Sequence, residues 1–236
     1  MTQLIVALDE PTYDRARVIV EQTARHVQWH KVGYEAYCGY GDQILTLLRE
    51  CGKSIFLDLK LHDIPNTVGA AVRAAARSGA KLITLHAMGG SAMLAAAAAA
   101  RDEHNAAGGS LRLLAVTVLT SLSADDLHAL GVTGSPEDQV KRLALLAKAA
   151  GIDGAVCSVA EASGVRRACG PDFVLLCPGI RLAGGDAQDQ RRVATPGAAV
   201  LAGADFIVVG RPITKAADPA AAARAILDDL GNKINI

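Results

Sequence analysis

The sequence lacks an excess of charge of either sign. Its 236 residues contain 24 Lys and Arg residues against 24 Asp and Glu residues, and no stretch is strongly basic. Binding to nucleic acid or to an anionic membrane surface depends on concentrated positive charge. We therefore expect no nucleic-acid partner and no membrane partner, and an anionic ligand must be held by a few placed groups.

The chain also lacks cysteine motifs and long apolar runs. Its cysteines are odd in number and form no C-x-x-C motif, which indicates reduced thiols. No apolar run reaches the length of a membrane span, and the first residues show no basic segment or cleavage site of a secretory signal. These features predict a cytoplasmic protein. The five cysteines are Cys38, Cys51, Cys157, Cys169 and Cys177.

Short apolar runs alternate with helical patterns along the whole chain. Eight apolar runs predict strands at Gln3–Leu8, Trp29–Val32, Ser54–Leu59, Leu82–His86, Arg112–Leu119, Gly154–Cys157, Phe173–Cys177 and Phe206–Val209. Eight segments predict helices at Tyr13–His26, Glu35–Cys51, Thr67–Ser78, Ser91–Asn105, Pro136–Ala150, Ala160–Cys169, Pro196–Ala202 and Pro219–Leu230. Eight strand–helix units predict an α/β fold, a single (β/α)8 TIM barrel over residues 1–236.

An open doubly wound sheet is the main alternative, because it also alternates strands and helices. Its usual glycine-rich motif, G-x-G-x-x-G, is absent after the first predicted strand, where the sequence reads Leu8-Asp9-Glu10-Pro11. This absence favours the barrel.

The run from Phe56 to Thr67, FLDLKLHDIPNT, is the strongest functional signal. It places Asp58, Lys60 and Asp63 at positions i, i+2 and i+5, where an apolar strand ends. Because side chains alternate along a strand, Asp58 and Lys60 should point to the same, interior side. Unlike charges in a partly closed interior are costly to desolvate unless they pair. A functional site explains this pattern, and a structural ion pair at a strand end is the alternative.

Polar residues end most of the other predicted strands. In a barrel the carboxyl ends of the strands form one face, and this face carries the chemistry. Any one of these residues could simply be a solvated or helix-capping side chain. The presence of so many polar residues at the same ends of the strands favours a functional site. The residues that this face should gather are Asp9, Lys31, Asp58, Lys60, Asp63, His86, Thr117, Thr120, Arg181, Gly210 and Arg211.

The charges favour decarboxylation. Lys31 and Lys60 with Asp58 and Asp63 can form an alternating array. A substrate carboxylate pressed against Asp58 would be repelled by roughly 4 kcal/mol at about 4 Å and an effective dielectric near 20, and losing carbon dioxide relieves that repulsion. Lys60 can stabilise the resulting carbanion and protonate it, so this chemistry needs no metal and no cofactor. The chain has no H-x-x-x-H pair, although scattered carboxylates could still hold magnesium.

The last strand and the preceding connection predict a phosphate site. Gly210 and Arg211 follow the eighth strand, where barrels often bind phosphate through backbone N–H groups and a nearby cation. The connection Gly179–Arg192, which contains Gln190, is long and polar enough to be a lid over that phosphate. A plain surface loop is the alternative.

These segments together resemble the orotidine 5'-monophosphate decarboxylase family. The Asp-x-Lys-x-x-Asp core also resembles magnesium-dependent sugar-phosphate decarboxylases and hexulose-phosphate synthases of the same superfamily. Lys31 and the Ile64-Pro65-Asn66-Thr67 extension separate the chain from those relatives. Besides residues 56–67, the resemblance rests on Ala7-Leu8-Asp9, Lys31-Val32-Gly33, Val118-Leu119-Thr120-Ser121, Pro178-Gly179-Ile180-Arg181, Asp189-Gln190-Arg191-Arg192 and Val209-Gly210-Arg211-Pro212.

The resemblance implies cofactor-free decarboxylation of orotidine 5'-monophosphate (OMP) to UMP in pyrimidine biosynthesis. In that reading Lys60 protonates C6 of the pyrimidine, Asp58 faces the substrate carboxylate, and Lys31 holds the array and the ribose. The resemblance further implies a homodimer in which Asp63 and Thr67 serve the neighbouring subunit's site.

The remaining implied roles concern substrate binding. Asp9 contacts the ribose and Thr120 reads the pyrimidine, while Arg181, Gln190, Gly210 and Arg211 form the phosphate grip and its lid. A barrel that binds a nucleotide without catalysis is a third hypothesis, and the resemblance assigns no chemistry to His62 or His86.

Overall fold

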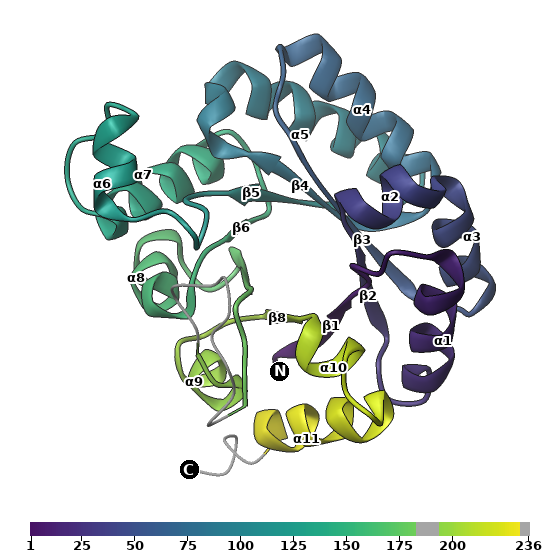
Figure 1. Cartoon of the computed structure of the whole chain (residues 1–236). Coiled ribbons are helices and arrows are strands. Elements are labelled where there is room, and N and C mark those ends of the chain that lie inside the picture. The colour runs from purple at the N-terminus through teal and green to yellow at the C-terminus, as the bar shows by residue number, and fades with distance from the viewer. Residues whose placement is uncertain (183–193, 232–236) are drawn as a thin grey trace.

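Eight parallel strands close into a barrel in the computed structural model, which describes residues 1–182 and 194–231 (Figure 1). β8 pairs with β1, so the open-sheet alternative is wrong and the predicted (β/α)8 barrel is confirmed. The strands are β1 (Gln3–Ala7), β2 (Trp29–Val32), β3 (Ser54–Leu61), β4 (Ala80–His86), β5 (Arg112–Val116), β6 (Gly154–Val156), β7 (Val174–Cys177) and β8 (Phe206–Val209).

Helices surround the strands and shield their outer faces. Among the described residues, no helix is long and apolar enough to cross a bilayer. The helices are α1 (Tyr13–Thr23), α2 (Tyr34–Tyr40), α3 (Asp42–Glu50), α4 (Pro65–Arg77), the 3-10 turn η1 (Ala87–Gly89), α5 (Gly90–Ala106), α6 (Ala124–Ala129), α7 (Pro136–Ala149), α8 (Val159–Cys169), α9 (Pro196–Leu201), α10 (Arg211–Thr214) and α11 (Pro219–Gly231).

Besides shifted ends and the 3-10 turn η1, the helices of the described residues differ from the prediction in three places. The single helix predicted over Glu35–Cys51 is divided at Gly41, whose φ of 56° and ψ of −132° suit a residue without a Cβ. The short α6 was not predicted, although Ser123 and Asp126 form a capping box at its start. The four-residue α10, which follows β8 directly, was also not predicted.

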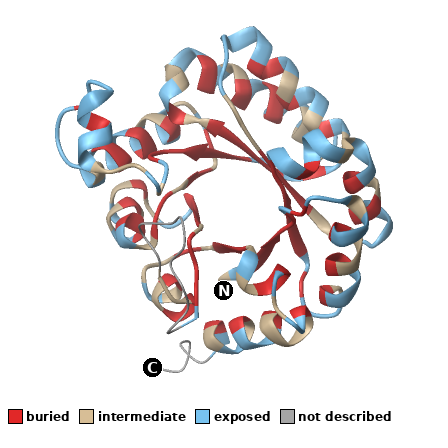
Figure 2. Cartoon of the chain, viewed as in Figure 1, coloured by how far each residue is buried: buried red, intermediate tan, exposed pale blue. Residues whose placement is uncertain are grey.

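Two apolar layers hold the barrel together. The outer layer lies between the strands and the helices, which bury one side and expose the other (Figure 2). The inner layer fills the barrel with side chains that include Ile5, Trp29, Phe56, Leu82, Leu114 and Phe206. Since side chains alternate, the residues two and four positions beyond Phe56, which are Asp58 and Lys60, face the same interior. The barrel thus has an apolar interior and a charged end, at the carboxyl ends of the strands.

Candidate active site

A cavity of about 600 Å³ opens at the carboxyl ends of the strands. Its apolar lining includes Ala7, Phe56, Val116, Val156, Leu176 and Val208. Its polar lining includes Asp9, Lys31, Glu35, Asp58, Lys60, Thr120, Arg181, Arg211, Thr214 and Lys215. An apolar pocket into which a few polar groups converge is typical of a small-molecule site.

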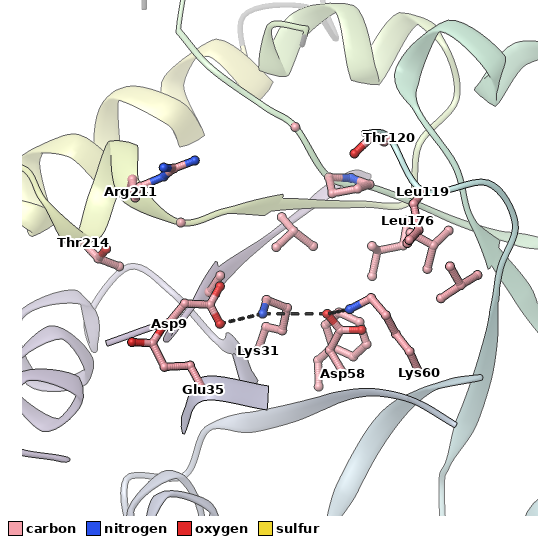
Figure 3. Close-up of a pocket in the computed structure, with 18 of the residues that line it drawn as sticks. Asp9, Lys31, Glu35, Asp58, Lys60, Leu119, Thr120, Leu176, Arg211 and Thr214 are labelled. Atoms are coloured by element: carbon pink, nitrogen blue, oxygen red, sulfur yellow. Dashed lines mark hydrogen bonds and ion pairs between the residues drawn. The ribbon is translucent and has the colours of Figure 1, made fainter. Parts of the chain in front are cut away.

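Four alternating charges form a row along one side of this cavity (Figure 3). Lys31 Nζ lies 2.9 Å from Asp9 Oδ1 and 3.7 Å from Asp58 Oδ2, and Lys60 Nζ lies 2.8 Å from the same Asp58 oxygen. The side chains of Lys31 and Asp58 are only 11% and 12% exposed. Each charge in the row therefore has an opposite neighbour that offsets part of its desolvation.

The Asp58 carboxyl group remains ionised despite its burial. Burial raises its pKa, but the charges of Lys31 and Lys60 and hydrogen bonds from Lys60 and Thr84 together lower the pKa below its ordinary value. At neutral pH the cavity wall therefore carries a negative charge at a fixed place, between two ammonium groups.

The backbone at Lys60 explains how the side chains of this segment are aimed. Lys60 has a φ of 44°, in the left-handed region that non-glycine residues rarely adopt. Leu57 pairs with Ile83 and Leu61 pairs with Leu85, so residues 58–60 of β3 lie opposite residue 84 of β4 alone. This bulge bends the strand end and re-aims the residues that it contains.

Thr84 lies at the centre of the bulge and was missed by the sequence reasoning. Its hydroxyl donates to Asp58 Oδ1 at 2.8 Å and accepts a hydrogen bond from the Lys60 backbone N–H at 3.0 Å. The same alternation that places Asp58 inside also places Thr84 inside, two residues after the inward-facing Leu82. This two-residue alternation along the strand would have predicted that Thr84 faces the interior.

The cavity also gathers the residues predicted to bind phosphate and pyrimidine, as far as they are described. Arg211 and Thr120 both line the cavity, and in Figure 3 they lie above the two ends of the charged row, Arg211 near Asp9 and Thr120 near Lys60. Gly210 and Arg181 line the cavity too, and Arg181 is buried. Gln190 and most of the predicted lid lie outside the described residues.

Asp63 and Thr67 do not line the cavity of this chain. Both are exposed, on the loop after β3 and the first turn of α4. The Ile64 backbone N–H donates to Asp63 Oδ1 at 2.6 Å, and the Ile64 side chain beside it is 67% exposed. Within this chain neither residue therefore belongs to the charged row, and their action in a neighbouring subunit stays a prediction.

A second buried carboxylate supports the wall of the cavity. Glu10, which follows Asp9, is completely buried, and its Oε2 lies 2.9 Å from Lys215 Nζ and 3.6 Å from Arg15 Nε. The ion pair between Glu10 and Lys215 joins the loop after β1 to the residue after α10. Neither Glu10 nor Lys215 has a signal of its own in the sequence, since their pairing depends on β1 and β8 being neighbours.

Two histidines lie near the strand ends, beside the charged row. The rings of His62 and His86 are 5.4 Å apart, and neither belongs to the described lining of the cavity. Burial, followed by the charges of His62 and Lys60, lowers the pKa of His86. Within residues 1–182 and 194–231, no group of three or more His, Cys, Asp or Glu side chains is placed to hold a metal ion.

Several known proteins are similar to this chain over nearly its whole length. The sequence profile described as the orotidine 5'-phosphate decarboxylase / HUMPS family matches residues 2–226. A protein named orotidine 5'-phosphate decarboxylase from Anaeromyxobacter sp. strain K is 51% identical over 224 residues, which cover 95% of this chain and 96% of that protein. Its namesake from Photobacterium profundum is 47% identical over 221 residues, covering 93% of this chain and 94% of that one.

A solved structure shows the same relationship in three dimensions. The crystal structure of orotidine 5'-phosphate decarboxylase from Lactobacillus acidophilus has a TM-score of 0.86 to this chain at 39% identity. The match covers 98% of this chain and 99% of that one.

Proposed function

Because the chain belongs to the orotidine 5'-phosphate decarboxylase / HUMPS family, we propose that it decarboxylates OMP to UMP in pyrimidine biosynthesis. The observation that carries this proposal is the row Asp9, Lys31, Asp58 and Lys60 on the cavity wall. A decarboxylase must make a carboxylate unstable and then accept the electron pair that the carboxylate leaves behind. The row has a group for each task.

Asp58 is proposed to face the carboxylate at C6 of the substrate. Two negative charges about 4 Å apart repel by roughly 4 kcal/mol at an effective dielectric near 20. The repulsion disappears when carbon dioxide leaves, so it favours the transition state over the bound substrate. The low pKa of Asp58 supports this role, because the group must stay charged while a second anion approaches.

Lys60 is proposed to complete the reaction. The bond between C6 and the carboxylate breaks, its electron pair stays on C6, and a proton moves from the Lys60 ammonium group to that carbon. Solvent then returns a proton to the amine. The 2.8 Å contact with Asp58 supports the assignment, since it holds the ammonium group beside the carboxylate that the substrate would face. The proposed step uses no cofactor.

Binding of the rest of the nucleotide is proposed to fall to the other sides of the cavity. Arg211, Gly210 and Arg181 would hold the 5'-phosphate, with Gln190 added from the predicted lid. A phosphate so far from C6 can raise the rate only if its binding favours the geometry of the transition state.

The ribose and the base are assigned to nearer groups. Asp9 and Lys31, which are joined by the 2.9 Å ion pair, would contact the ribose hydroxyl groups. Thr120 would read the pyrimidine. These assignments follow the family resemblance and the presence of all three side chains in the cavity lining.

The complete site is proposed to need a homodimer. Asp63 and Thr67 would enter the neighbouring subunit's cavity, where Asp63 adds a negative charge beside Lys60. Their exposure, and that of the apolar Ile64 between them, supports this reading.

A substrate comparison tests the proposal. Purified protein, treated with EDTA, is mixed with OMP, and loss of OMP absorbance is followed together with UMP formation. The runner-up is a magnesium-dependent enzyme of the same family acting on a keto-sugar phosphate. Turnover of OMP in EDTA supports the proposal, whereas turnover of a keto-sugar phosphate in magnesium without turnover of OMP would overturn it.

A further inference from the structure

The bulge in β3 changes the hydrogen-bond partner of the Lys60 backbone N–H. In a regular ladder the backbone of β3 would bond to that of β4, but residues 58–60 have only residue 84 opposite them. The Lys60 N–H therefore bonds to the Thr84 side chain instead of to a strand carbonyl. This bond holds a residue whose φ of 44° is unfavourable for a non-glycine residue.

The two oxygens of Asp58 have different partners. Oδ2 faces the ammonium groups of Lys60 and Lys31, and Oδ1 accepts the hydrogen bond from the Thr84 hydroxyl. The terminal torsion of an aspartate has a broad range. A carboxylate held at one oxygen can rotate, whereas a carboxylate held at both has a fixed plane.

A threonine suits this place for physical reasons. Its hydroxyl can donate one hydrogen bond and accept another at once, and here it donates to a carboxylate and accepts from an N–H. Its branched Cβ restricts the first side-chain torsion. Thr84 is completely buried and lies in the middle of β4, where it pairs with Leu114 of β5. The hydroxyl thus has a rigid support.

We propose that Thr84 is a positioning residue, which fixes the Asp58 carboxylate and the Lys60 backbone in one arrangement so that both charges meet the reacting carbon correctly. The inference rests on the proposed decarboxylation and extends it to a residue that touches no substrate. A loosely held pair would lose rate, because catalytic groups must be placed to within a fraction of an ångström.

Two substitutions separate this role from a packing role. Thr84→Val keeps the shape and removes the hydroxyl, whereas Thr84→Ser keeps the hydroxyl and removes a methyl group. For Thr84→Val we expect kcat for OMP to fall by about tenfold to a hundredfold, as for a lost hydrogen bond to a charged group, with a smaller change in KM. For Thr84→Ser we expect kcat within about threefold of wild type, since the hydroxyl is kept and only the apolar contacts of one methyl group are lost.

A matched control measures the effect of losing a buried threonine hydroxyl elsewhere. The Thr23 hydroxyl is also buried and donates to the Ile19 carbonyl at 2.7 Å, in α1. Thr23→Val should lower the melting temperature and leave kcat unchanged. If Thr84→Val behaves in the same way, with a lower melting temperature and the kcat of wild type, Thr84 only packs and the proposal is wrong.

A double substitution tests whether Thr84 acts through Asp58. In an Asp58→Asn background, Thr84→Val should reduce kcat by a smaller factor than it does in the wild-type background, because the partner of the hydroxyl has already changed. An equal or larger factor in the two backgrounds would contradict the assignment.

Hydrogen exchange gives a readout that does not depend on activity. The Lys60 amide should exchange at least about tenfold faster in Thr84→Val than in wild type or Thr84→Ser, since it loses its acceptor. Unchanged exchange would overturn the backbone part of the proposal. Wild-type protein that fails to turn over OMP would instead overturn the proposed function and the catalytic role of Thr84 with it.

Discussion

Replacing Asp58 by Asn removes the negative charge at the centre of the row. Asp58 Oδ2 lies 2.8 Å from Lys60 Nζ and 3.7 Å from Lys31 Nζ. At an effective dielectric near 20, these attractions are about 6 and about 4.5 kcal/mol before desolvation is subtracted. Lys31 keeps Asp9 as a partner at 2.9 Å, and the Lys60 side chain is 27% exposed, so the fold should tolerate the change with reduced stability.

The same substitution should slow the chemical step without weakening the binding of substrate. If a substrate carboxylate lies about 4 Å from Asp58, the repulsion that decarboxylation relieves is roughly 4 kcal/mol. Losing all of it would slow the chemical step by up to about a thousandfold, at about 1.4 kcal/mol for each factor of ten. Because the repulsion also weakens the ground-state complex, KM should fall rather than rise.

The assay is loss of OMP absorbance over a range of substrate concentrations, with circular dichroism to check the fold. Asp153→Asn is the matched control, since Asp153 pairs with Arg101 and bonds to the Leu113 backbone N–H at 2.7 Å, outside the cavity lining. It should affect stability alone. A folded Asp58→Asn protein with kcat within about threefold of wild type would refute the electrostatic reasoning.

Two further predictions concern the dimer and the pH dependence of stability. Mixing inactive Lys60→Ala and Asp63→Ala subunits should restore activity in one of the two sites of each heterodimer, and a mixture that stays inactive would contradict the shared site. Burial, and then the charge of Lys53, lowers the pKa of His30 to about 3. The unfolded chain binds a proton there below about pH 6.5, whereas the folded chain does so only near pH 3. Between these values the free energy of unfolding should therefore decrease as the pH is lowered, by up to about 1.4 kcal/mol per pH unit. His30→Gln should make chemical denaturation less dependent on pH in that window, and an unchanged slope would contradict the assignment of this effect to His30.

The sequence contains enough information for the barrel and for the centre of the site. The strands are buried on both faces and therefore appear as short apolar runs, which made all eight recognisable. The alternation of side chains along β3 correctly placed Asp58 and Lys60 on one side, where they form an ion pair. Strand ends also pointed to Asp9, Lys31 and Arg211, which line the same cavity.

Features that depend on the pairing of neighbouring strands could not be predicted from the sequence of one strand. The bulge at residues 58–60 is a mismatch between β3 and β4, so neither the positive φ of Lys60 nor its bond to Thr84 has a signal within one strand. Asp63, which is predicted to complete the array from a neighbouring subunit, lies outside the row of this chain, and the place of Asp9 beside Lys31 depends on the pairing of β1 with β2. The break at Gly41 was missed because the apolar period continues across it.

The most direct test of the central claim is the turnover of OMP by Lys60→Ala beside wild type, at equal concentrations of folded protein and in EDTA. Both the stabilising charge and the proton at C6 are assigned to this ammonium group. We predict that wild type forms UMP and that folded Lys60→Ala loses nearly all turnover. A folded Lys60→Ala protein that retains kcat within about tenfold of wild type would contradict this assignment.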